Sequence, residues 1–364
     1  MGDKEAFKKA VRLVIDKVHF NLDSRVQVFE VTIRVLGGLL SAHQLAVDNT
    51  LGFKIEWYKG ELLALAKDLG DRLMPAFESP THIPFPRVNL MTGVLSYEVP
   101  EACSAGAGTL ILEFGVLSRL TGNPKYEKAA KLSLETLWKH RSSLNLVGNT
   151  IDILKATWKD SNAGIGAGID SIYEYMLKAY VLFGEDHYLE MFDLSYSGIM
   201  ASIADKSRFV YQNINMFSGK RSSNWIDSLA AFFPGLQVLA GDLENAIKHH
   251  YMYFLIWKRY GALPERYDYM RHITDIPSYP LRPELIESTY MLYQATKDPF
   301  YLRFGEMMLN DLELMARVKC GFASLRDVRT GEKEERMESF FLSETLKYLY
   351  LLFDEGTDTI SIVF

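Results

Sequence analysis

The stretch that decides the fold runs from Ala107 to Arg141 and reads AGTLILEFGVLSRLTGNPKYEKAAKLSLETLWKHR. Apolar residues recur at three- and four-residue spacing on both sides of TGNP, a pattern typical of two amphipathic helices. The Gly and Pro between them mark a tight turn, because neither residue favours the interior of a helix. The stretch therefore predicts a helical hairpin.

The same arrangement occurs twice more, in YVLFGEDHYLEMF (180–192) and in LYQATKDPFYLRF (292–304). Helical periodicity also covers most of the remaining chain, interrupted by β-like pieces at HIPFPRVNL (82–90), LNLVGNTIDI (144–153), FVYQNINMF (209–217) and CGFASLRDV (320–328). Hairpins repeated in this way predict a solenoid or a closed α/α toroid, with the β-like pieces on one rim. We expect a single domain over residues 1–364.

The composition argues against several classes of protein. Apolar residues make up 48% of the 364 residues, so we expect a well-buried core. A formal net charge of −6 without a long basic run argues against binding to nucleic acid. No apolar window of about 18 residues predicts a membrane span, and the charged opening MGDKEAFKKAV does not have the pattern of a signal peptide. Cys103 and Cys320 match no zinc or redox spacing and leave one disulfide or none open.

Acidic residues within apolar helical segments are the main candidates for chemistry. They are Glu30 with Arg34 in VFEVTIRVLGG, Glu113 in ILEF, Asp170 in GIDSIYEY, Asp227 in NWIDSL, Arg282, Glu284 and Glu287 in LRPELIES, and Glu338 and Glu344 in MESFFLSETLKY. Taken singly, Glu284 after Pro283 complements a helix dipole, and Glu30 with Arg34 forms an ordinary pair one turn apart.

Taken together, these acids favour a shared pocket. Apolar neighbours leave Glu30, Glu113 and Glu344 little solvated surface, so each carboxylate needs a partner, a cation or a raised pKa. A pair of such acids is what glycoside hydrolysis requires. Aromatic platforms for sugar rings are expected from Tyr173, Tyr175, Trp225, Phe340 and Phe341.

The longer motifs resemble glycoside hydrolase family 47, the α-1,2-mannosidases. The resemblance rests on VFEVTIRVLGGLLSAH, DRLMPAF, IPFPRVNL, AGAGTLILEFGVLSRLTG, GAGIDSIYEYMLKAY, WIDSLAAFFPGL, LRPELIESTYMLYQAT and RMESFFLSETLKYLYLLF, which cover nearly the whole chain. IWKRYGALPERYD and the WIDSL form resemble the branch of ER degradation-enhancing α-mannosidase-like proteins. The implied fold is an all-α (α/α)7 barrel.

The resemblance also implies roles, residue by residue. It makes Glu30 the general acid with Arg34 as its partner, and Asp170 and Glu284 the other catalytic acids, with Glu284 preferred as base. The implied substrate-binding residues are Arg34, Glu113, Asp227, Arg282, Glu287, Phe340 and Glu344. An inverting mechanism requires about 6.5–9.5 Å between the acid and the base, which leaves room for a water molecule.

The family resemblance further implies Ca²⁺ as cofactor, together with some departures from the pattern. The threonine that anchors calcium in the family is expected just beyond Phe364, so no residue of this chain is predicted as a direct metal ligand. We expect the barrel to lack its first helix and its C-terminal plug. Gly168 and Ser228 replace an arginine and a histidine of the processing enzymes. Cys320 is expected to pair with a cysteine preceding this chain rather than with Cys103.

The implied function is inverting removal of α-1,2-linked mannose from high-mannose N-glycans of misfolded glycoproteins in the endoplasmic reticulum lumen, which promotes their degradation. An ER oxidoreductase and the degradation machinery are the further partners that the resemblance suggests. Two alternatives stay open from the residues: a glycan-binding or client-recruiting module without turnover, and a shortened product that folds incompletely and exposes apolar helix faces.

Overall fold

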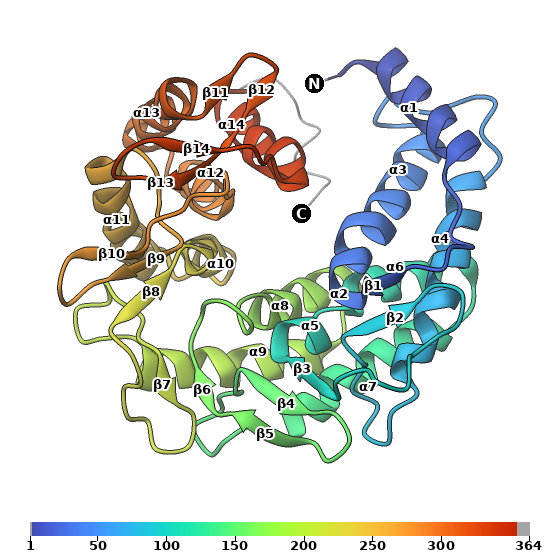
Figure 1. Cartoon of the computed structure of the whole chain (residues 1–364), viewed down its shortest axis with the longest axis horizontal. Coiled ribbons are helices and arrows are strands. Elements are labelled where there is room, and N and C mark those ends of the chain that lie inside the picture. The colour runs from blue at the N-terminus through green and yellow to red at the C-terminus, as the bar shows by residue number, and fades with distance from the viewer. Residues whose placement is uncertain (1, 355–364) are drawn as a thin grey trace. The chain divides into compact units, whose positions relative to one another are not determined.

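The computed structural model describes residues 2–354, which divide into two compact units. Unit 1 comprises Met1–Ser161 and Ser171–Leu194, and unit 2 comprises Asn162–Asp170 and Ser195–Phe364. Both units are built mainly of helices joined by short turns, with small antiparallel sheets of two or three strands (Figure 1). The prediction of a single domain over 1–364 stays a prediction.

Unit 1 contains the first nine helices and five of the short strands. The helices are α1 (Lys4–Lys17), α2 (Val28–Val31), α3 (Gly37–Val47), α4 (Glu61–Leu73), α5 (Ser104–Gly108), α6 (Ile111–Thr121), α7 (Lys125–Lys139), α8 (Ser171–Phe183) and α9 (Asp186–Gly198), which runs on into unit 2. A π-helical turn, Thr32–Leu36, joins α2 to α3, and a 3₁₀ turn, Met74–Phe77, follows α4. The strands are β1 (Arg25–Gln27) with β2 (Arg87–Asn89), and β3 (Glu101–Cys103) with β4 (Thr150–Asp152) and β5 (Thr157–Asp160).

Unit 2 contains the remaining elements. Its helices are α10 (Phe233–Leu239), α11 (Leu243–Tyr260), α12 (Glu284–Thr296), α13 (Pro299–Met315) and α14 (Leu346–Phe353). Two π-helical turns, Ile199–Ile203 and Phe341–Thr345, and a 3₁₀ turn, Leu229–Phe232, adjoin them. The strands are β6 (Asn162–Ala163) with β7 (Ile214–Asn215), β8 (Trp225–Asp227) with β9 (Arg266–Asp268) and β10 (Ile273–Ile276), β11 (Arg317–Val318) with β12 (Gly321–Phe322), and β13 (Ser324–Asp327) with β14 (Glu332–Glu334).

The three predicted hairpin joints are confirmed. Helix α6 ends at Gly122, whose φ of 69° closes the helix in the left-handed conformation that glycine favours, and α7 starts directly after Pro124. Gly184, with φ of 72°, lies between α8 and α9 in the same way. At the third joint Asp298 caps α13 by accepting a hydrogen bond from the Phe300 N–H at 2.8 Å. The predicted β-like pieces likewise contain β2, β4, β7, β12 and β13.

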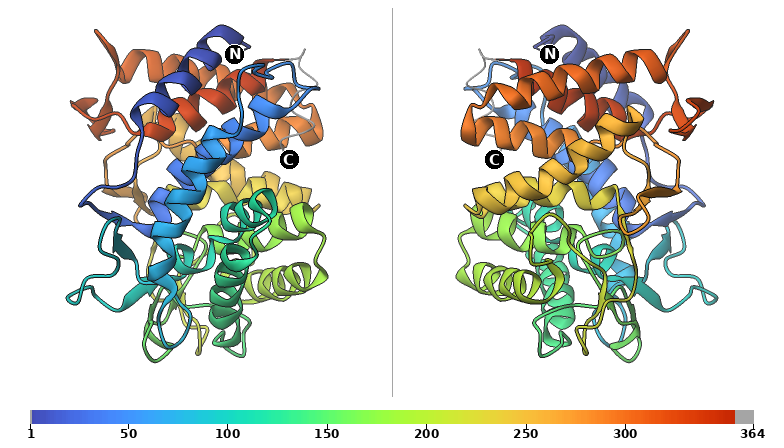
Figure 2. Two further views of the ribbon diagram at one scale, coloured as in Figure 1. Left: turned by 90° about the vertical axis from the view of Figure 1, so that its right-hand side faces the viewer. Right: turned by 90° about the vertical axis from the view of Figure 1, so that its left-hand side faces the viewer.

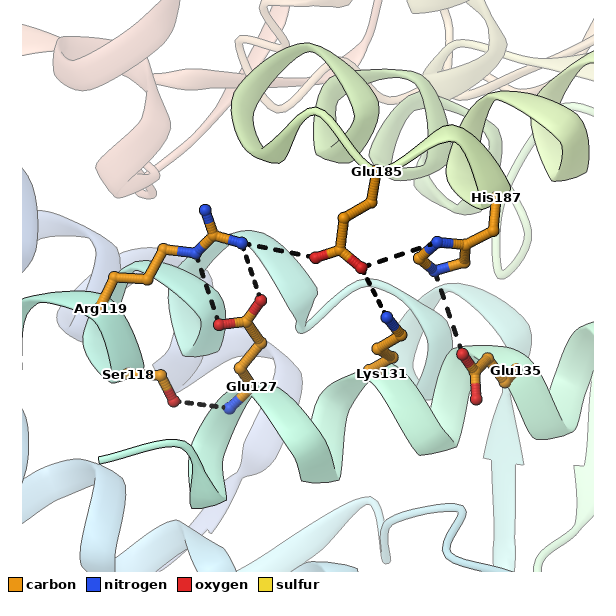
Figure 3. A network of polar contacts seen from close by, with 7 residues as sticks. All are labelled: Ser118, Arg119, Glu127, Lys131, Glu135, Glu185 and His187. Carbon is orange, nitrogen blue, oxygen red and sulfur yellow. Dashed lines mark hydrogen bonds and ion pairs between the residues drawn. The ribbon is translucent and has the colours of Figure 1, made fainter. Parts of the chain in front are cut away.

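A chain of charged side chains ties the first two joints together within unit 1 (Figure 3). Arg119 donates to Glu127 at 3.0 Å and lies 3.5 Å from Glu185, which in turn accepts from Lys131 at 2.6 Å. His187 lies 3.7 Å from the same Glu185 carboxylate. The pattern links α6, α7 and the start of α9 through charges of alternating sign.

The cores of both units are aromatic and aliphatic. In unit 1, Phe114 of α6 packs against Phe77 and Tyr126 with ring centroids 5.3 and 6.3 Å apart. In unit 2, Leu292 of α12 packs with Ala246 of α11 and Tyr301 of α13, so α12 is enclosed by its neighbours. The gold and orange helices of unit 2 are seen from the side in the right-hand view of Figure 2. None of the helices in residues 2–354 is long and apolar enough to cross a membrane.

Candidate active site

Glu30 and Arg34 form an ion pair at the start of the α2–α3 segment of unit 1. Arg34 Nε lies 2.6 Å from Glu30 Oε2, and the two side chains are 35% and 38% exposed. The expectation that apolar neighbours bury Glu30 is therefore wrong. Val28, Thr32 and Leu36 take the buried face of the segment, which leaves Glu30 on another face of the helix. The pair is close and oriented, but it stays open to solvent.

The backbone around Arg34 departs from a regular α-helix. Arg34 lies in the π-helical turn Thr32–Leu36, a rare geometry that occurs often at functional sites. Directly after it, Gly37 lies beside Glu113 of α6, since a Cβ at that position would lie at van der Waals distance, 3.5 Å, from Glu113 Cγ. The turn and the glycine together bring α3 close to an acid on the neighbouring helix.

Glu113 is a buried acid with one oxygen unused. Tyr175 of α8 donates a hydrogen bond to Glu113 Oε1 at 2.9 Å, whereas the buried Oε2 has no hydrogen-bond partner among residues 2–354. Burial raises the pKa of Glu113 to about 7, although the Tyr175 hydrogen bond and the charge of Lys178 act to lower it. A buried carboxylate with a free oxygen costs stability, so it points to a role beyond packing.

In unit 2, a strained turn precedes the acids of LRPELIES. Leu281 is fully buried and has a φ of 65°, a left-handed conformation that is a genuine outlier for a bulky side chain. The strain, about 1–3 kcal/mol, is held by neighbours: Thr345 Oγ1 donates to the Leu281 carbonyl at 2.7 Å, and the Tyr279 hydroxyl donates to the Arg282 carbonyl at 3.2 Å. This turn sets the direction in which Arg282 leaves the backbone.

Arg282 is clamped by an acid that sequence reasoning missed. Its Nε donates to Glu265 Oε1 and its second amino group donates to Glu265 Oε2 at 2.8 Å, a bidentate pair. Burial acts to lower the pKa of Arg282, but Glu265, Glu284 and Asp170 outweigh burial and raise the pKa above its usual value. Glu265 also accepts a hydrogen bond from Ser228 Oγ at 3.1 Å. The one available signal was its place in the family-like motif IWKRYGALPERYD.

Glu284, the first residue of α12, is a mostly buried acid without a close cationic partner. Its side chain is only 16% exposed, the Arg282 guanidinium lies no nearer than 3.9 Å, and its buried Oε2 has no hydrogen-bond partner in the described chain. Burial raises the pKa of Glu284 to about 8; Arg282 acts against the rise, while Glu344 and Glu287 add to it. The structure therefore brings Glu287 and Glu344 near Glu284, and the repulsion among these acids favours the protonated form of Glu284.

The other acids of unit 2 surround this group. Glu287 accepts a hydrogen bond from the Tyr348 hydroxyl of α14 at 2.9 Å. Glu344 lies in the π-helical turn Phe341–Thr345, so a π turn carries a candidate residue in each unit. Phe340, just before that turn, lies with its ring 5.9 Å from the Arg282 guanidinium carbon.

The glycine-rich loop holds Asp227. The Ala167 N–H donates to Asp227 Oδ2 at 3.4 Å, and a Cβ at Gly166 would lie 2.4 Å from the same oxygen, so only glycine fits there. Burial raises the pKa of Asp227, opposed by the Ala167 hydrogen bond and Arg266, and Oδ1 has no hydrogen-bond partner among residues 2–354. Asp170 follows this loop, and its negative charge helps to raise the pKa of Arg282.

The structure separates the candidates into two groups and leaves some expectations untested. Glu30, Arg34 and Glu113 belong to unit 1, whereas the remaining candidates, Asp170, Asp227, Arg282, Glu284, Glu287, Phe340 and Glu344, belong to unit 2. The predicted 6.5–9.5 Å separation of Glu30 from Glu284 stays a prediction. The sugar platforms expected at Tyr173 and Phe341 are wrong, because both rings are 1% exposed and fill the core.

The two groups of acids differ from a typical calcium site. Within residues 2–354 no three His, Cys, Asp or Glu side chains are grouped as direct metal ligands, and the calcium-anchoring threonine expected just beyond Phe364 lies outside the described residues. The orphaned Glu284 Oε2 among like charges nevertheless fits a hard cation nearby, because such a cation would offset the mutual repulsion. Neither Cys103 nor Cys320 is in a disulfide among the described residues, and Cys103 Sγ accepts a hydrogen bond from the Gly106 N–H at 3.3 Å.

Comparison with known proteins places this geometry in a family. The family model for glycosyl hydrolase family 47 matches residues 1–363. The chain is 50% identical over 355 residues to ER degradation-enhancing alpha-mannosidase-like protein 1 of Schizosaccharomyces pombe, covering 98% of this chain and 45% of that protein. It is 48% identical over 362 residues to alpha-mannosidase I MNS5 of Arabidopsis thaliana, covering 98% of this chain and 62% of that protein. The chain thus spans about half the length of the curated relatives it matches.

A solved structure agrees with these sequence matches. The α-1,2-mannosidase from Trichoderma reesei superposes with a TM-score of 0.87 at 27% identity, covering 98% of this chain and 83% of that one. The match confirms the predicted all-α (α/α)7 barrel class with short antiparallel sheets. The sequence, the fold class and the buried acids agree, and the chain belongs to glycosyl hydrolase family 47.

Proposed function

We propose that the protein hydrolyses α-1,2-linked mannose of high-mannose N-glycans with inversion. The observation that carries the proposal is Glu284, an acid with a buried, unpaired oxygen and a pKa raised to about 8, beside the clamped Arg282. Membership of family 47 supports glycoside hydrolysis as the chemistry. The names of the relatives support mannose as the sugar.

The proposed catalytic roles are those of a proton donor and a proton acceptor. Glu30 donates its proton to the glycosidic oxygen as the bond to the leaving sugar breaks, and Arg34, at 2.6 Å, holds the Glu30 carboxyl in position. Glu284 removes a proton from the water that attacks the anomeric carbon from the opposite face. We also assign Asp170 to the catalytic acids, as the third after Glu30 and Glu284. After product release, solvent returns one proton to Glu30 and takes one from Glu284.

The remaining candidates bind and orient the sugar. Buried carboxylates accept hydrogen bonds from sugar hydroxyls, and Glu113 and Asp227 each retain an oxygen without a partner among residues 2–354. Glu287 and Glu344 extend this acceptor surface, and Phe340 supplies an aromatic side chain beside Arg282. Glu265 and Ser228 act through Arg282 as positioning residues.

A bound Ca²⁺ would explain how Glu284 acts as a base at neutral pH. With its pKa raised to about 8, the carboxylate is largely protonated at pH 7, which is the wrong state for a base. The acid that fits such an ion is Glu284, because it keeps an unpaired oxygen and the charges of Glu344 and Glu287 raise its affinity for positive charge. When bound, the cation would supply positive charge that keeps Glu284 ionised and polarises water.

We further propose that the substrates are glycans of misfolded glycoproteins in the endoplasmic reticulum lumen, and that an ER oxidoreductase or the degradation machinery acts with the protein. The support lies in relatives that are named ER degradation-enhancing alpha-mannosidase-like proteins.

The test is mannose release from a nine-mannose N-glycan in the presence of Ca²⁺, counted by mass spectrometry. Glu30→Gln and Glu284→Gln are each expected to abolish release, whereas Glu244→Gln, which removes an exposed i,i+4 pair with Lys248, leaves it unchanged. NMR of the first product should show β-mannose, the inverted anomer. Binding of the glycan by the wild type without release would establish the glycan-binding alternative and reject the enzyme.

A further inference from the structure

A surface cavity of unit 2 lies apart from all the candidate acids. It has a volume of about 630 Å³ and is formed where α11 ends, where α13 ends, and at the turn between β13 and β14. Its lining includes Arg259, Tyr260, Leu314, Met315, Arg329 and Lys333. The volume falls within the range of binding pockets in proteins.

Two of the cations that line the cavity, Arg259 and Lys333, form no ion pair with a described carboxylate. Its lining contains three cationic side chains and no acidic one. Arg329 is already paired with Asp327, with Nε to Oδ1 at 2.9 Å. Arg259 and Lys333 instead donate to the backbone carbonyls of His272, at 3.0 Å, and Arg317, at 2.8 Å. Two full positive charges therefore remain for a ligand.

Other acids near the cavity are also engaged. Glu313 of α13 pairs with Arg317 at 2.8 Å, and Glu332 of β14 pairs with Arg326 at 2.9 Å. These pairs leave the cationic character of the cavity intact, because each acid already has its own arginine.

Helix capping does not account for Arg259. A cation in the last turn often binds the final carbonyls of its own helix. Arg259 is in the last turn of α11, yet it donates to His272 in the turn between β9 and β10. The end of α11 is closed instead by the Gly261 N–H, which donates to the Trp257 carbonyl at 2.7 Å.

An apolar surface adjoins these charges. Leu314, near the end of α13, is 81% exposed, more than any other large apolar side chain in residues 2–354. A single exposed leucine is ordinary, but this one lines a cavity together with Met315 and Tyr260. Methionine adapts its shape to different apolar partners, which suits a recognition surface.

We propose that this cavity is a docking site for an acidic peptide segment that carries an apolar side chain. The carboxylates of the peptide pair with Arg259 and Lys333, and its apolar side chain packs on Leu314 and Met315. Charge complementarity selects this partner, since clustered cations recognise acidic motifs and steer them to the surface. The interaction is independent of the sugar chemistry, which uses none of these residues.

The test is fluorescence anisotropy with the labelled peptide Asp-Glu-Leu-Phe-Glu-Asp in 50 mM NaCl. Saturable binding is expected, weakening about tenfold or more in the double variant Arg259→Glu/Lys333→Glu and by roughly threefold in Leu314→Ser. A matched control, Lys206→Glu, changes an exposed lysine of unit 2 outside the cavity and is expected to bind within about twofold of the wild type. Raising NaCl to 300 mM should weaken binding further.

Three outcomes would overturn the proposal. They are equal binding of Lys-Lys-Leu-Phe-Lys-Lys, unchanged affinity in the double variant, and no saturation by millimolar peptide. Circular dichroism confirms that each variant is folded. Mannose release should be the same for wild type and double variant, so a failed docking site is distinguishable from a failed hydrolase.

Discussion

Two groups of charged residues in this protein differ in how their charges are paired. In the network of Figure 3, Glu185 is within 3.7 Å of Lys131, Arg119 and His187, so positive and negative groups alternate. Around Glu284, the charges of Glu344 and Glu287 add to its own, and the nearby Arg282 is already bound bidentately by Glu265. In the first group each acid lies beside a basic side chain or His187 and the side chains are partly exposed, whereas the second group is negative and largely buried.

The difference separates structural charges from functional ones. Exposed pairs each contribute about 0–1 kcal/mol and need no ligand to be satisfied. A buried acid with an unpaired oxygen costs stability unless something binds it. Strain at Leu281 and the π turn at Phe341–Thr345 adjoin the second group, as is common where local structure serves function.

The largest expected effect is on catalysis. Glu284→Gln should lower kcat about 10³-fold, because it removes the proton acceptor while keeping the shape of the side chain. Glu127→Gln, the matched change in the Figure 3 network, should leave kcat within about twofold. Steady-state mannose release measures both, and equal losses in the two variants would erase the distinction between the groups.

Stability should depend on pH through the buried acids. Folding raises the pKa of Glu284 to about 8 and that of Glu113 to about 7, from 4.5. The stabilising contribution of these two acids to the free energy of unfolding is therefore complete below pH 4.5 and is lost as pH rises through 7 and 8. For each acid, the free energy of unfolding falls by up to about 1.4 kcal/mol per pH unit.

Calorimetry without added calcium measures this dependence. Glu284→Gln should have a Tm near that of the wild type at pH 5 and a higher Tm at pH 8.5, because glutamine does not ionise. Adding Ca²⁺ should restore stability to the wild type at pH 8.5. A Tm difference that is the same at both pH values would contradict the raised pKa.

A smaller effect is expected from Arg282→Lys. Lysine keeps the charge but cannot make the bidentate contact with Glu265, so we expect a loss of about 1–3 kcal/mol in the free energy of unfolding. The kcat should fall as well, because Arg282 is positioned by that contact. Urea unfolding and kinetics measure the two effects, and Arg326→Lys, in an exposed pair with Glu332, is the control.

The smallest effect is expected in the network. Lys131→Met removes the 2.6 Å pair with Glu185 and should lower the free energy of unfolding by about 0.5 kcal/mol in low salt. The difference should shrink in 1 M NaCl, because salt screens exposed pairs. A loss above about 2 kcal/mol that persists in high salt would show that this network is not an ordinary surface feature.

Much of the fold could be predicted from sequence. The hairpin joints at Gly122, Gly184 and Asp298 depend on glycine conformation and helix capping, which are local. Candidate site residues were also visible, as acids inside apolar helical segments. Glu30 shows the limit of that argument, because its apolar neighbours bury other faces of the helix and leave it 38% exposed.

By itself, the sequence determined the helices, their joints and the family, because each depends on residues close together in the chain or on motifs of fixed order. Only the tertiary structure decided that Glu265 clamps Arg282, that Leu281 is strained, and that Glu284 holds an unpaired oxygen. These features depend on burial and on charges from elements far apart in the sequence. Desolvation and Coulomb energy are set by neighbours in space, which no local pattern specifies.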